Sequence, residues 1–421
     1  MPCIRVIGGR PLHGCLSIQG AKNAVLPIMA ATLCTKGRCT LLGCPDICDV
    51  HTAIEILQTL GCEAEFDHGT VRIDTGARSG AAIPPPLAEK MRSSVTFLGA
   101  LMSAAGEATV PLPGGCVLGA RPLDLHLSGL QTLGAEVSAE DGTIRCRGRL
   151  CGGTVVLRYP SVGATENLML AALDAEAPVT IIGAAKEPEI VDLGDFLNAC
   201  GAQVSGAGSA TIRVSGGAKQ GCTYRVMPDR MAAASYLCAA AASGGSLTLT
   251  ETEPTQIEAV LSVLRASGCE IETAPGRIAL KAGALRAVPP VVTGPYPAFP
   301  TDAQAPVMAA LCRAEGVTVF DETVFENRYR HVPALVRLGA DIQVSGSIAR
   351  VRGVRSLHGA DMIATDLRGG AAMLIAALSA EGESRIFEPR HLLRGYEHIC
   401  ANLRSVGAEV TAEDTNEPDL R

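Results

Sequence analysis

Tryptophan is absent from this chain, and aromatic side chains make up only 3% of its 421 residues. Hydrophobic residues nevertheless reach 47% and charged residues 19%, which is typical of a globular protein and not of a disordered one. The cores must therefore be built from Ala, Val, Leu and Ile. The chain is too long for one ordinary core, so we expect two domains of about 200 residues each.

An excess of positive charge and long apolar runs are also missing. The net charge of −7 argues against a nucleic-acid or anionic-membrane surface, although a few local cations could still bind a small anion. The longest apolar stretches, such as residues 231–242, are Ala-rich and too short to span a bilayer. No charged segment followed by an apolar run opens the chain, so we expect no signal peptide, no membrane insertion and a cytoplasmic location.

The sixteen cysteines include no Cys-x-x-Cys pair. Cys34, Cys39, Cys44 and Cys48 are close enough in sequence to suggest a metal site, but the residues between them resemble a helix end and a strand. We therefore expect most cysteines to be small buried hydrophobic residues, and no metal site.

One signature recurs six times: a leucine-bearing helix end, a glycine and then a strand. Its glycines stand 67 to 73 residues apart, at positions 61, 134, 201, 268, 339 and 407. Such self-similarity indicates one supersecondary unit copied six times. In the third copy we expect a helix from Ser161 to about residue 174, a strand at 179–182, a helix at 190–200 and two short strands. Gly201 is expected to cap the second helix in a left-handed conformation.

The repeats predict an α/β architecture. Both helices of each repeat are apolar on more than one face, which favours helices inside and sheets outside, with three repeats to a domain. Residues 1–20 are strand-like, whereas the last repeat has no clear final strand after Val410. We therefore expect residues 22–228 to form one domain. Residues 1–21 and 229–421 would form the second, with the chain crossing twice between them.

Polar residues open the first helix of every repeat. Helix N-termini favour bound anions, but Ser161, Thr301 and Asp366 could also be ordinary N-caps. Lys22, Arg92 and Arg368 oppose the helix dipole, so capping does not explain them, whereas a bound anion would.

The loop at residues 112–126 is long and rich in glycine. Cys116 lies on it, five residues before Arg121. A thiol on a mobile loop near a cation is a candidate nucleophile or proton donor, and an ordinary structural thiol is the alternative. Arg328 and Arg394 stand in the corresponding loops of the last two repeats, either as solvated charges or as cations facing a common cleft.

Taken together, these segments resemble the UDP-N-acetylglucosamine 1-carboxyvinyltransferase family, the enolpyruvyl transferases that open bacterial peptidoglycan synthesis. The resemblance covers essentially the whole chain. Its strongest segments are residues 20–24, 113–122, 161–165, 297–302, 325–328, 365–368 and 394–397.

The resemblance implies a two-domain inside-out α/β barrel of six repeats. It also implies transfer of the enolpyruvyl group of phosphoenolpyruvate to the 3′-hydroxyl of UDP-N-acetylglucosamine, with release of phosphate. No cofactor or metal is implied. A covalent phosphoenolpyruvate adduct on Cys116 is possible chemistry for the family, and inhibitors of the fosfomycin type would alkylate that thiol.

The resemblance also implies residue roles. Cys116 would protonate C3 of phosphoenolpyruvate and Asp302 would be the general base, with Lys22 and Arg394 completing the catalytic set. Phosphoenolpyruvate would contact Lys22, Asn23, Arg92, Cys116, Arg121, Arg368 and Arg394. The UDP-sugar would contact Asn23, Arg92, Arg121, Pro122, Leu123, Asp124, Leu125, Ser161, Val162, Gly163, Asp302 and Val324.

Three departures from the family pattern put nucleotide affinity in question. Arg158 precedes Tyr159 where Lys is common nearby, Lys186 replaces a usual Arg, and Met231–Ala234 replace an Ile-Glu start. Two alternatives stay open: a non-catalytic or regulatory paralogue of the same fold, and a transferase acting on shikimate 3-phosphate. A purely structural repeat protein would not explain cations at helix starts.

Overall fold

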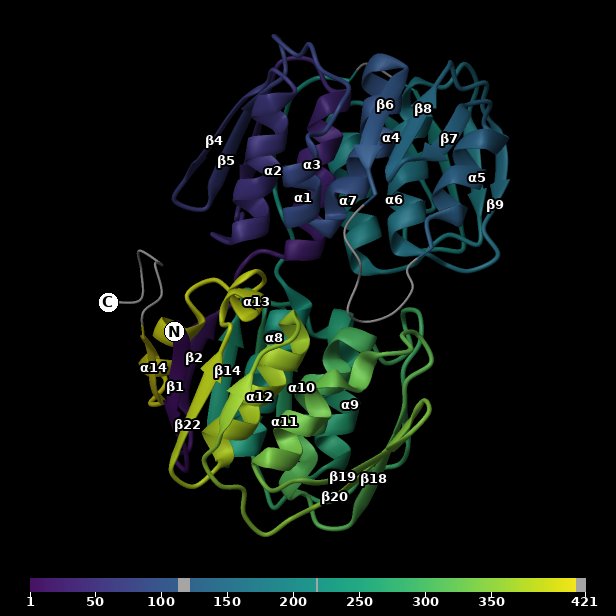
Figure 1. Cartoon of the computed structure of the whole chain (residues 1–421). Coiled ribbons are helices and arrows are strands. Elements are labelled where there is room, and N and C mark those ends of the chain that lie inside the picture. The colour runs from purple at the N-terminus through teal and green to yellow at the C-terminus, as the bar shows by residue number, and fades with distance from the viewer. Residues whose placement is uncertain (113–121, 217–218, 414–421) are drawn as a thin grey trace. The chain divides into compact units, whose positions relative to one another are not determined.

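The computed structural model describes residues 1–112, 122–216 and 219–413, which fold as two compact units (Figure 1). The amino-terminal unit contains the described residues between 20 and 227. The carboxy-terminal unit contains residues 1–19 and 228–413.

Three sheets belong to the described part of the amino-terminal unit. The first has the order β13 (Thr223–Arg225), β3 (Arg38–Leu42), β5 (Thr70–Asp74) and β4 (Glu63–Asp67). The second has the order β6 (Glu107–Pro111), β8 (Thr143–Arg147) and β7 (Glu136–Glu140). The third has the order β11 (Gln203–Ser205), β12 (Thr211–Ser215), β10 (Val179–Ile182) and β9 (Gly153–Val156).

Three more sheets belong to the described part of the carboxy-terminal unit. One has the order β21 (Asp361–Ile363), β22 (Glu383–Phe387), β1 (Cys3–Ile7) and β23 (Glu409–Glu413). Another has the order β15 (Glu270–Ala274), β16 (Arg277–Lys281), β14 (Ser246–Thr250) and β2 (His13–Ser17). The last has the order β17 (Val291–Val292), β18 (Val317–Asp321), β20 (Ile348–Arg352) and β19 (Asp341–Ser345).

The amino-terminal residues complete two of these sheets, as predicted. Strand β1 lies antiparallel between β22 and β23, and β2 pairs in parallel with β14. One expectation was wrong in detail, because the last repeat does end in a strand, β23. Main-chain pairing with β1 forms this strand although the sequence after Val410 is polar. The local sequence pattern gave no sign of that pairing.

The first helix of each repeat lies in the interior, and Figure 1 shows the strands of each unit around its helices. These inner helices are α1 (Lys22–Ala31), α4 (Phe97–Ala105), α6 (Val162–Ala171), α8 (Arg230–Ser243), α10 (Thr301–Ala310) and α12 (Leu367–Ser379). Small residues allow this packing: a side chain at Gly99 of α4 would place its Cβ 2.1 Å from the carbonyl oxygen of Asn167 on α6. Helices inside and sheets outside are therefore confirmed.

Eight further helices lie among the described residues. They are α2 (Cys48–Thr59), α3 (Pro85–Lys90), α5 (Asp124–Thr132), α7 (Pro188–Ala199), α9 (Glu258–Ala266), α11 (Val332–Arg337), α13 (Arg390–Leu393) and α14 (Ile399–Ser405). Short 3₁₀ turns are η1 (Thr32–Cys34), η2 (Arg92–Thr96), η3 (Ala172–Asp174), η4 (Pro254–Ile257), η5 (Leu311–Arg313) and η6 (Arg328–His331). Helix α3 was not foreseen, and the inner helix of the second repeat opens with the 3₁₀ turn η2.

The six signature glycines all have positive φ, from 87° to 107°. Gly201 follows α7, where a left-handed residue ends the helix and the chain turns into β11. The predicted left-handed conformation is therefore confirmed in every repeat. A β-carbon at these positions would be strained, which explains why glycine recurs with the repeat.

Within each unit the inner helices are parallel. In the amino-terminal unit, Arg78 donates to Leu33 and Ala104, which places the C-terminal ends of η1 and α4 together. In the carboxy-terminal unit, Arg368 at the start of α12 contacts Asp302 at the start of α10. The N-termini of a unit's inner helices thus gather at one end, where the predicted site residues lie.

Candidate active site

The start of α1 holds a buried ion pair. Lys22 Nζ lies 2.7 Å from Asp49 Oδ2 in the first turn of α2, and both residues are buried. The carboxylate offsets a cation that would otherwise oppose the α1 dipole. Asn23, the next residue, is exposed. The sequence analysis did not identify Asp49 as the partner of Lys22. An acidic residue in the first turn of an otherwise apolar helix could have indicated it.

The start of α6 adds backbone donors beside a buried histidine. Ser161 is the N-cap and accepts from the Ala164 N–H at 3.3 Å, so its predicted capping role is confirmed. Val162 and Gly163 are partly exposed in the first turn. A Cβ at Gly163 would lie 3.1 Å from His126 Cε1, so glycine gives the imidazole room at this helix end.

His126 is neutral and fixed in orientation. Its Nδ1 lies 2.8 Å from the Asn167 side-chain nitrogen, whose amide also binds the Val95 carbonyl and the Gly99 N–H. Burial, followed by the charge of Arg92, lowers the pKa of His126 to about 4. Because the amide donates to Nδ1, the proton lies on Nε2, which is a potential donor. Asn167, a buried amide in an apolar helix, was the signal that sequence reasoning missed.

The segment after the undescribed loop leads into α5. Pro122 is exposed, and Leu123 and Leu125 pack partly against the hydrophobic core. The Asp124 carboxylate forms an ion pair with Arg158, one of the three departures from the family pattern. This pair is largely exposed and therefore adds little to stability. It does place Arg158 beside a residue expected to contact the nucleotide.

A protonated carboxyl lies one turn further along α6. Glu166 is buried, and its Oε2 accepts from the Thr96 hydroxyl at 3.5 Å. Burial, followed by the charge of Glu189, raises the pKa of Glu166 to about 8. At neutral pH the carboxyl therefore holds its proton close to the end of η2.

Two arginines hold the predicted base, Asp302. Arg328 Nη2 donates to Asp302 Oδ1 at 2.9 Å, and Arg368 Nε donates to Oδ2 at 3.3 Å. Both guanidinium groups are buried, whereas the Asp302 side chain is 32% exposed. The carboxylate is thus fixed in orientation but still accessible from solvent. The structure brings Asp302 and Arg368 into direct contact and adds Arg328 as a third member.

Further hydrogen bonds orient the two arginines. Arg328 also donates to the Thr301 carbonyl through Nε at 3.2 Å and Nη2 at 3.0 Å. Arg368 Nη1 donates to the Tyr396 hydroxyl at 3.0 Å, and that hydroxyl lies 2.7 Å from Ser235 Oγ. The Asp302 carboxylate is therefore the exposed end of a buried polar network that joins three inner helices.

Two N-cap predictions have different outcomes here. Asp366 caps α12 by accepting from the Gly369 N–H at 2.9 Å, as expected. Thr301 is not a cap, because Pro300 occupies the N-cap position and Thr301 lies inside the helix. Its hydroxyl donates instead to the Glu322 carboxylate at 3.0 Å.

Glu322 shapes the loop that carries Val324. The buried carboxylate accepts from the backbone N–H groups of Val324 and Phe325, each at 3.0 Å. The loop after β18 is therefore tied to the start of α10, and Val324 is left partly exposed. The sequence analysis assigned no role to Glu322.

Arg394 follows α13 and is partly exposed. The segment after it is fixed by Gln19, whose side-chain amide donates to the Gly395 carbonyl at 3.1 Å and accepts from the Glu397 N–H at 2.8 Å. A residue near the chain's beginning thus orients the last repeat's loop, which no local pattern could indicate. Cys116 and Arg121 lie outside the described residues.

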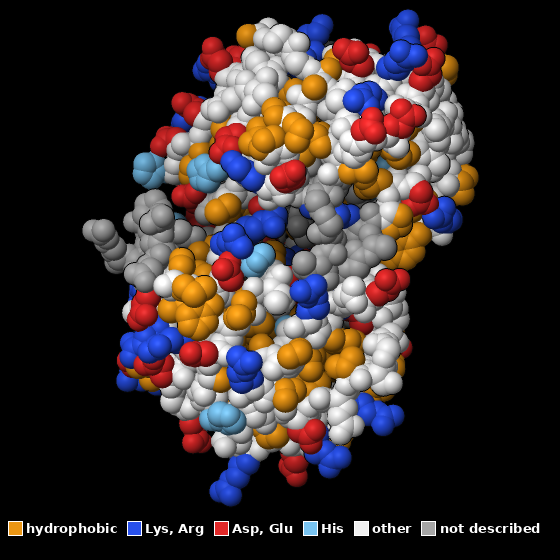
Figure 2. All heavy atoms as spheres, in the orientation of Figure 1, with side chains coloured by type: hydrophobic (Ala, Val, Ile, Leu, Met, Phe, Trp, Pro, Cys, Tyr) orange, Lys and Arg blue, Asp and Glu red, His pale blue; other side chains and the backbone are white. Residues whose placement is uncertain are grey.

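Other features of the described residues concern metal binding, membrane crossing and surface charge. None of their His, Cys, Asp and Glu side chains gather in a group of three or more that could hold a metal ion. No described helix has the length and apolar character needed to cross a membrane. Positive and negative side chains are interspersed on the face shown in Figure 2.

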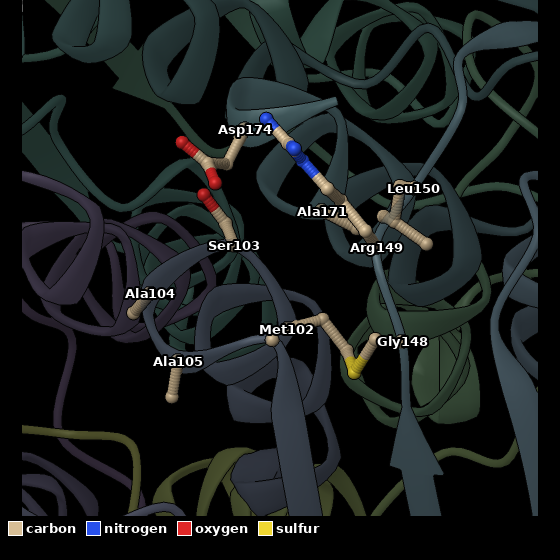
Figure 3. A pocket seen from close by; sticks show the side chains of 10 residues that line it. Met102, Ser103, Ala104, Ala105, Gly148, Arg149, Leu150, Ala171 and Asp174 are labelled. Atoms are coloured by element: carbon tan, nitrogen blue, oxygen red, sulfur yellow. The ribbon is translucent and has the colours of Figure 1, made fainter. Parts of the chain in front are cut away.

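A pocket of the amino-terminal unit lies at the C-terminal ends of its inner helices, and its lining includes none of the predicted site residues. It is lined by the C-terminal ends of α4 and α6, and Figure 3 shows Ser103 and Asp174 converging on it. Its lining includes no residue from the starts of these helices. Within each unit, we therefore place the candidate site residues at the N-termini of the inner helices, where the buried cations and carboxylates lie.

Comparisons with known proteins identify the family and the fold of this chain. A family profile described as EPSP synthase (3-phosphoshikimate 1-carboxyvinyltransferase) matches residues 6–403. A UDP-N-acetylglucosamine 1-carboxyvinyltransferase from Nitratidesulfovibrio vulgaris strain Hildenborough is 46% identical over 411 residues, covering 96% of this chain and 98% of that protein. UDP-N-acetylglucosamine 1-carboxyvinyltransferase 2 from Caldanaerobacter subterraneus subsp. tengcongensis is 44% identical over 409 residues, with the same two shares.

Solved structures show the same fold at lower identity. The crystal structure of the enolpyruvyl transferase NikO from Streptomyces tendae matches with a TM-score of 0.87 at 24% identity, covering 98% of both chains. EPSP synthase from Acinetobacter baumannii matches with a TM-score of 0.75 at 19% identity, covering 98% of this chain and 100% of that chain. The two-domain enolpyruvyl transferase fold expected from the sequence is therefore confirmed.

Proposed function

Because the chain belongs to the family of UDP-N-acetylglucosamine 1-carboxyvinyltransferases, we propose that it moves the enolpyruvyl group of phosphoenolpyruvate to the 3′-hydroxyl of UDP-N-acetylglucosamine and releases phosphate. This is the first committed step of peptidoglycan synthesis. Identity above 40% across 96% of the chain carries the proposal. The network around Asp302 supports it, because two arginines orient a carboxylate that is still accessible from solvent.

The residues at the helix starts suit an anionic substrate. Phosphoenolpyruvate carries a phosphate and a carboxylate, which charge-assisted hydrogen bonds from Lys and Arg stabilise strongly. We assign this binding to Lys22, Asn23, Arg92, Arg121, Arg368 and Arg394. Lys22 is already paired with Asp49, so the pair is preorganised and needs little reorganisation when the substrate arrives.

The proposed reaction has an addition step and an elimination step. The sugar 3′-hydroxyl attacks C2 of phosphoenolpyruvate, Asp302 accepts the hydroxyl proton, and the Cys116 thiol gives a proton to C3. The C2–O bond to phosphate then breaks, phosphate leaves, and C3 returns a proton to the Cys116 thiolate, which forms the enolpyruvyl ether. A covalent adduct of phosphoenolpyruvate on Cys116 is the alternative use of the same thiol. No cofactor is needed for either route.

The two arginines around Asp302 limit how it can act. Guanidinium groups favour the ionised carboxylate, so Asp302 is ready to accept a proton but is a weak base. Its main contribution is then to orient the hydroxyl and to stabilise positive charge that develops at C2 after C3 is protonated. Arg328 and Arg368 are positioning residues for this carboxylate.

The UDP-sugar is assigned to three segments. They are residues 122–125, residues 161–163 and the loop that carries Val324, with Asn23, Arg92, Arg121 and Asp302 nearby in the proposed complex. Because Arg158 pairs with Asp124, it is a candidate to replace the lysine usual near Tyr159. We also propose a cytoplasmic location, where both substrates are made.

Phosphate release tests this function. The purified protein is given phosphoenolpyruvate with and without UDP-N-acetylglucosamine, and the product is identified by mass spectrometry. Release that needs both substrates, with the enolpyruvyl group on the sugar nucleotide, is expected. Folded protein that binds the UDP-sugar but releases no phosphate would instead indicate the non-catalytic paralogue.

A further inference from the structure

Three cysteines from different segments meet in the amino-terminal unit, away from the helix starts. Cys39 lies in β3, Cys200 directly follows α7, and Cys222 directly precedes β13. Cys200 Sγ and Cys222 Sγ are 3.3 Å apart, and both residues are reduced thiols. Cys39 Sγ lies 3.4 Å from the Thr35 hydroxyl and also accepts a hydrogen bond from the Cys200 thiol.

Main-chain contacts hold these thiols in place. The Gln220 N–H donates to the Cys200 carbonyl at 2.8 Å, and the Thr40 N–H donates to the Cys222 carbonyl at 2.9 Å. A Cβ at Gly221 would lie 2.0 Å from the Arg38 carbonyl oxygen, so only glycine lets this segment lie against β3. The backbone path of these segments therefore brings Cys200 and Cys222 close together.

The three sulfur atoms differ in exposure and in charge. Cys39 and Cys200 are buried, whereas Cys222 is partly exposed. Hydrogen bonds from the Cys200 thiol, the Thr35 hydroxyl and the Cys222 N–H lower the pKa of Cys39 to about 6. The hydrogen bond to Cys39 raises the pKa of Cys200, which keeps its proton. Cys39 is thus the proton acceptor nearest to Cys200, the thiol that touches Cys222. Burial raises the pKa of Cys222 itself.

We propose that Cys200 and Cys222 form a reversible disulfide when a peroxide reaches the partly exposed Cys222. The Cys222 sulfur attacks the O–O bond, which breaks to give a sulfenic acid and, after protonation, water. Cys200 then attacks that sulfur: the S–S bond forms, the S–O bond breaks, and hydroxide leaves. The Cys200 proton passes to Cys39 and then to the hydroxide, giving a second water. The peroxide is reduced and the two thiols are oxidised.

A soft metal ion is the other occupant that three thiols could suggest. The geometry does not favour it, because no group of His, Cys, Asp and Glu among the described residues is arranged to hold an ion. The close contact involves two sulfur atoms, which matches a disulfide. The new bond would close a loop across 22 residues and tie the end of α7 to the start of β13. This inference is independent of the proposed transferase function.

Peptide mapping after oxidation tests the proposal. The full-length protein is exposed to graded hydrogen peroxide, the remaining thiols are alkylated, and the digest is analysed by mass spectrometry. We expect a Cys200–Cys222 crosslinked peptide that exceeds the sulfinic acid form of Cys222 at least about tenfold and that dithiothreitol removes. The exposed Cys15 and Cys151 serve as internal standards for simple oxidation, and the buried Cys34 and Cys312 as standards for protection.

Two variants separate the pair from its neighbours. Cys200→Ser should abolish the crosslink and let Cys222 proceed to sulfinic acid, whereas Cys39→Ala should slow the crosslink without changing the partners. Oxidation of the wild type should also raise its unfolding temperature by about 3 to 8 °C, and oxidation of Cys200→Ser should not. A crosslink that joins Cys39 to either partner, or a Cys222 that overoxidises while Cys200 stays reduced, would overturn the proposal.

Discussion

The two ends of the inner helices carry cations for different reasons. At the C-terminal ends, Arg78 donates to Ala104, Lys219 donates to Leu173 at 2.8 Å, and Arg313 donates to Ser379 at 3.3 Å. Cations there satisfy free carbonyls and follow the helix dipole. At the N-terminal ends, Lys22 and Arg368 oppose the dipole.

The cations at the two helix ends differ in the partners that they bind. The C-terminal cations bind backbone oxygens that every helix end provides, so folding alone explains them. The N-terminal cations are buried, and each is paired with a carboxylate from another helix. Lys22 contacts Asp49, and Arg368 contacts Asp302. Burying such ion pairs costs free energy. Buried cations at helix N-termini, which by themselves favour bound anions, therefore point to substrate binding. Substitutions at the two ends should therefore separate activity from stability.

The largest effect is expected for Asp302→Asn. This change keeps the shape of the side chain but removes the charge that accepts the hydroxyl proton, so turnover should fall by about 10³-fold or more. Steady-state phosphate release measures the loss, and calorimetric titration should show that the UDP-sugar still binds. Asp341→Asn, in an exposed pair with Arg352, is the matched control and should keep full turnover. Normal turnover in Asp302→Asn would remove Asp302 from the mechanism.

Arg328→Met should damage both stability and activity. It removes a buried guanidinium from Asp302 and from the Thr301 carbonyl, so the free energy of unfolding should fall by about 3 kcal/mol and turnover at least about tenfold. Arg313→Met at the C-terminal end should cost about 1 kcal/mol and leave turnover unchanged. Urea unfolding and phosphate release measure both. An equal loss of turnover in the two variants would erase the distinction between the helix ends.

Lys22→Met should act mainly on phosphoenolpyruvate. It removes a proposed phosphate ligand and the cation that contacts Asp49, so KM for phosphoenolpyruvate should rise about 10- to 100-fold. Arg78→Met should leave KM unchanged while it lowers the free energy of unfolding by about 1 to 2 kcal/mol. Initial rates over a range of phosphoenolpyruvate concentrations give KM for each. A KM that stays constant in Lys22→Met would contradict the anion-binding assignment.

The smallest effect concerns pH. Glu166 has a raised pKa of about 8 in the folded protein, so its contribution to stability falls as pH rises from the unfolded value near 4.5 to about 8. Glu166→Gln cannot ionise. Its free energy of unfolding relative to wild type should therefore increase by about 2 kcal/mol between pH 5 and pH 6.5. Urea unfolding at several pH values checks this, and a difference that is flat with pH would show that Glu166 is not protonated.

The repeat pattern predicted the elements that local sequence determines. The strand expected at 179–182 is β10, and the expected helix end at Gly201 lies just after Cys200, the C-cap of α7. Periodicity and glycine report on one segment at a time, so they place helices, strands and caps well. They also placed Lys22 and Arg368 at helix starts, where the opposed dipole identified both as unusual.

The partners of those residues could not be read from sequence because they come from other elements. Asp49 lies on α2, and Gln19 reaches a loop almost 380 positions away in the chain. The capping alternative for Thr301 was wrong, because its hydroxyl donates to Glu322 in the loop after β18. Cys39 was correctly expected to be buried, but its contact with Cys200 depends on how two sheets of the unit are assembled.

The most direct test of the central claim is acceptor choice. Phosphate release from phosphoenolpyruvate is measured with UDP-N-acetylglucosamine or with shikimate 3-phosphate as the only acceptor, at matched concentrations. The account predicts release with the sugar nucleotide and a rate at background with shikimate 3-phosphate. Faster release with shikimate 3-phosphate would contradict it and assign the chain to the other acceptor.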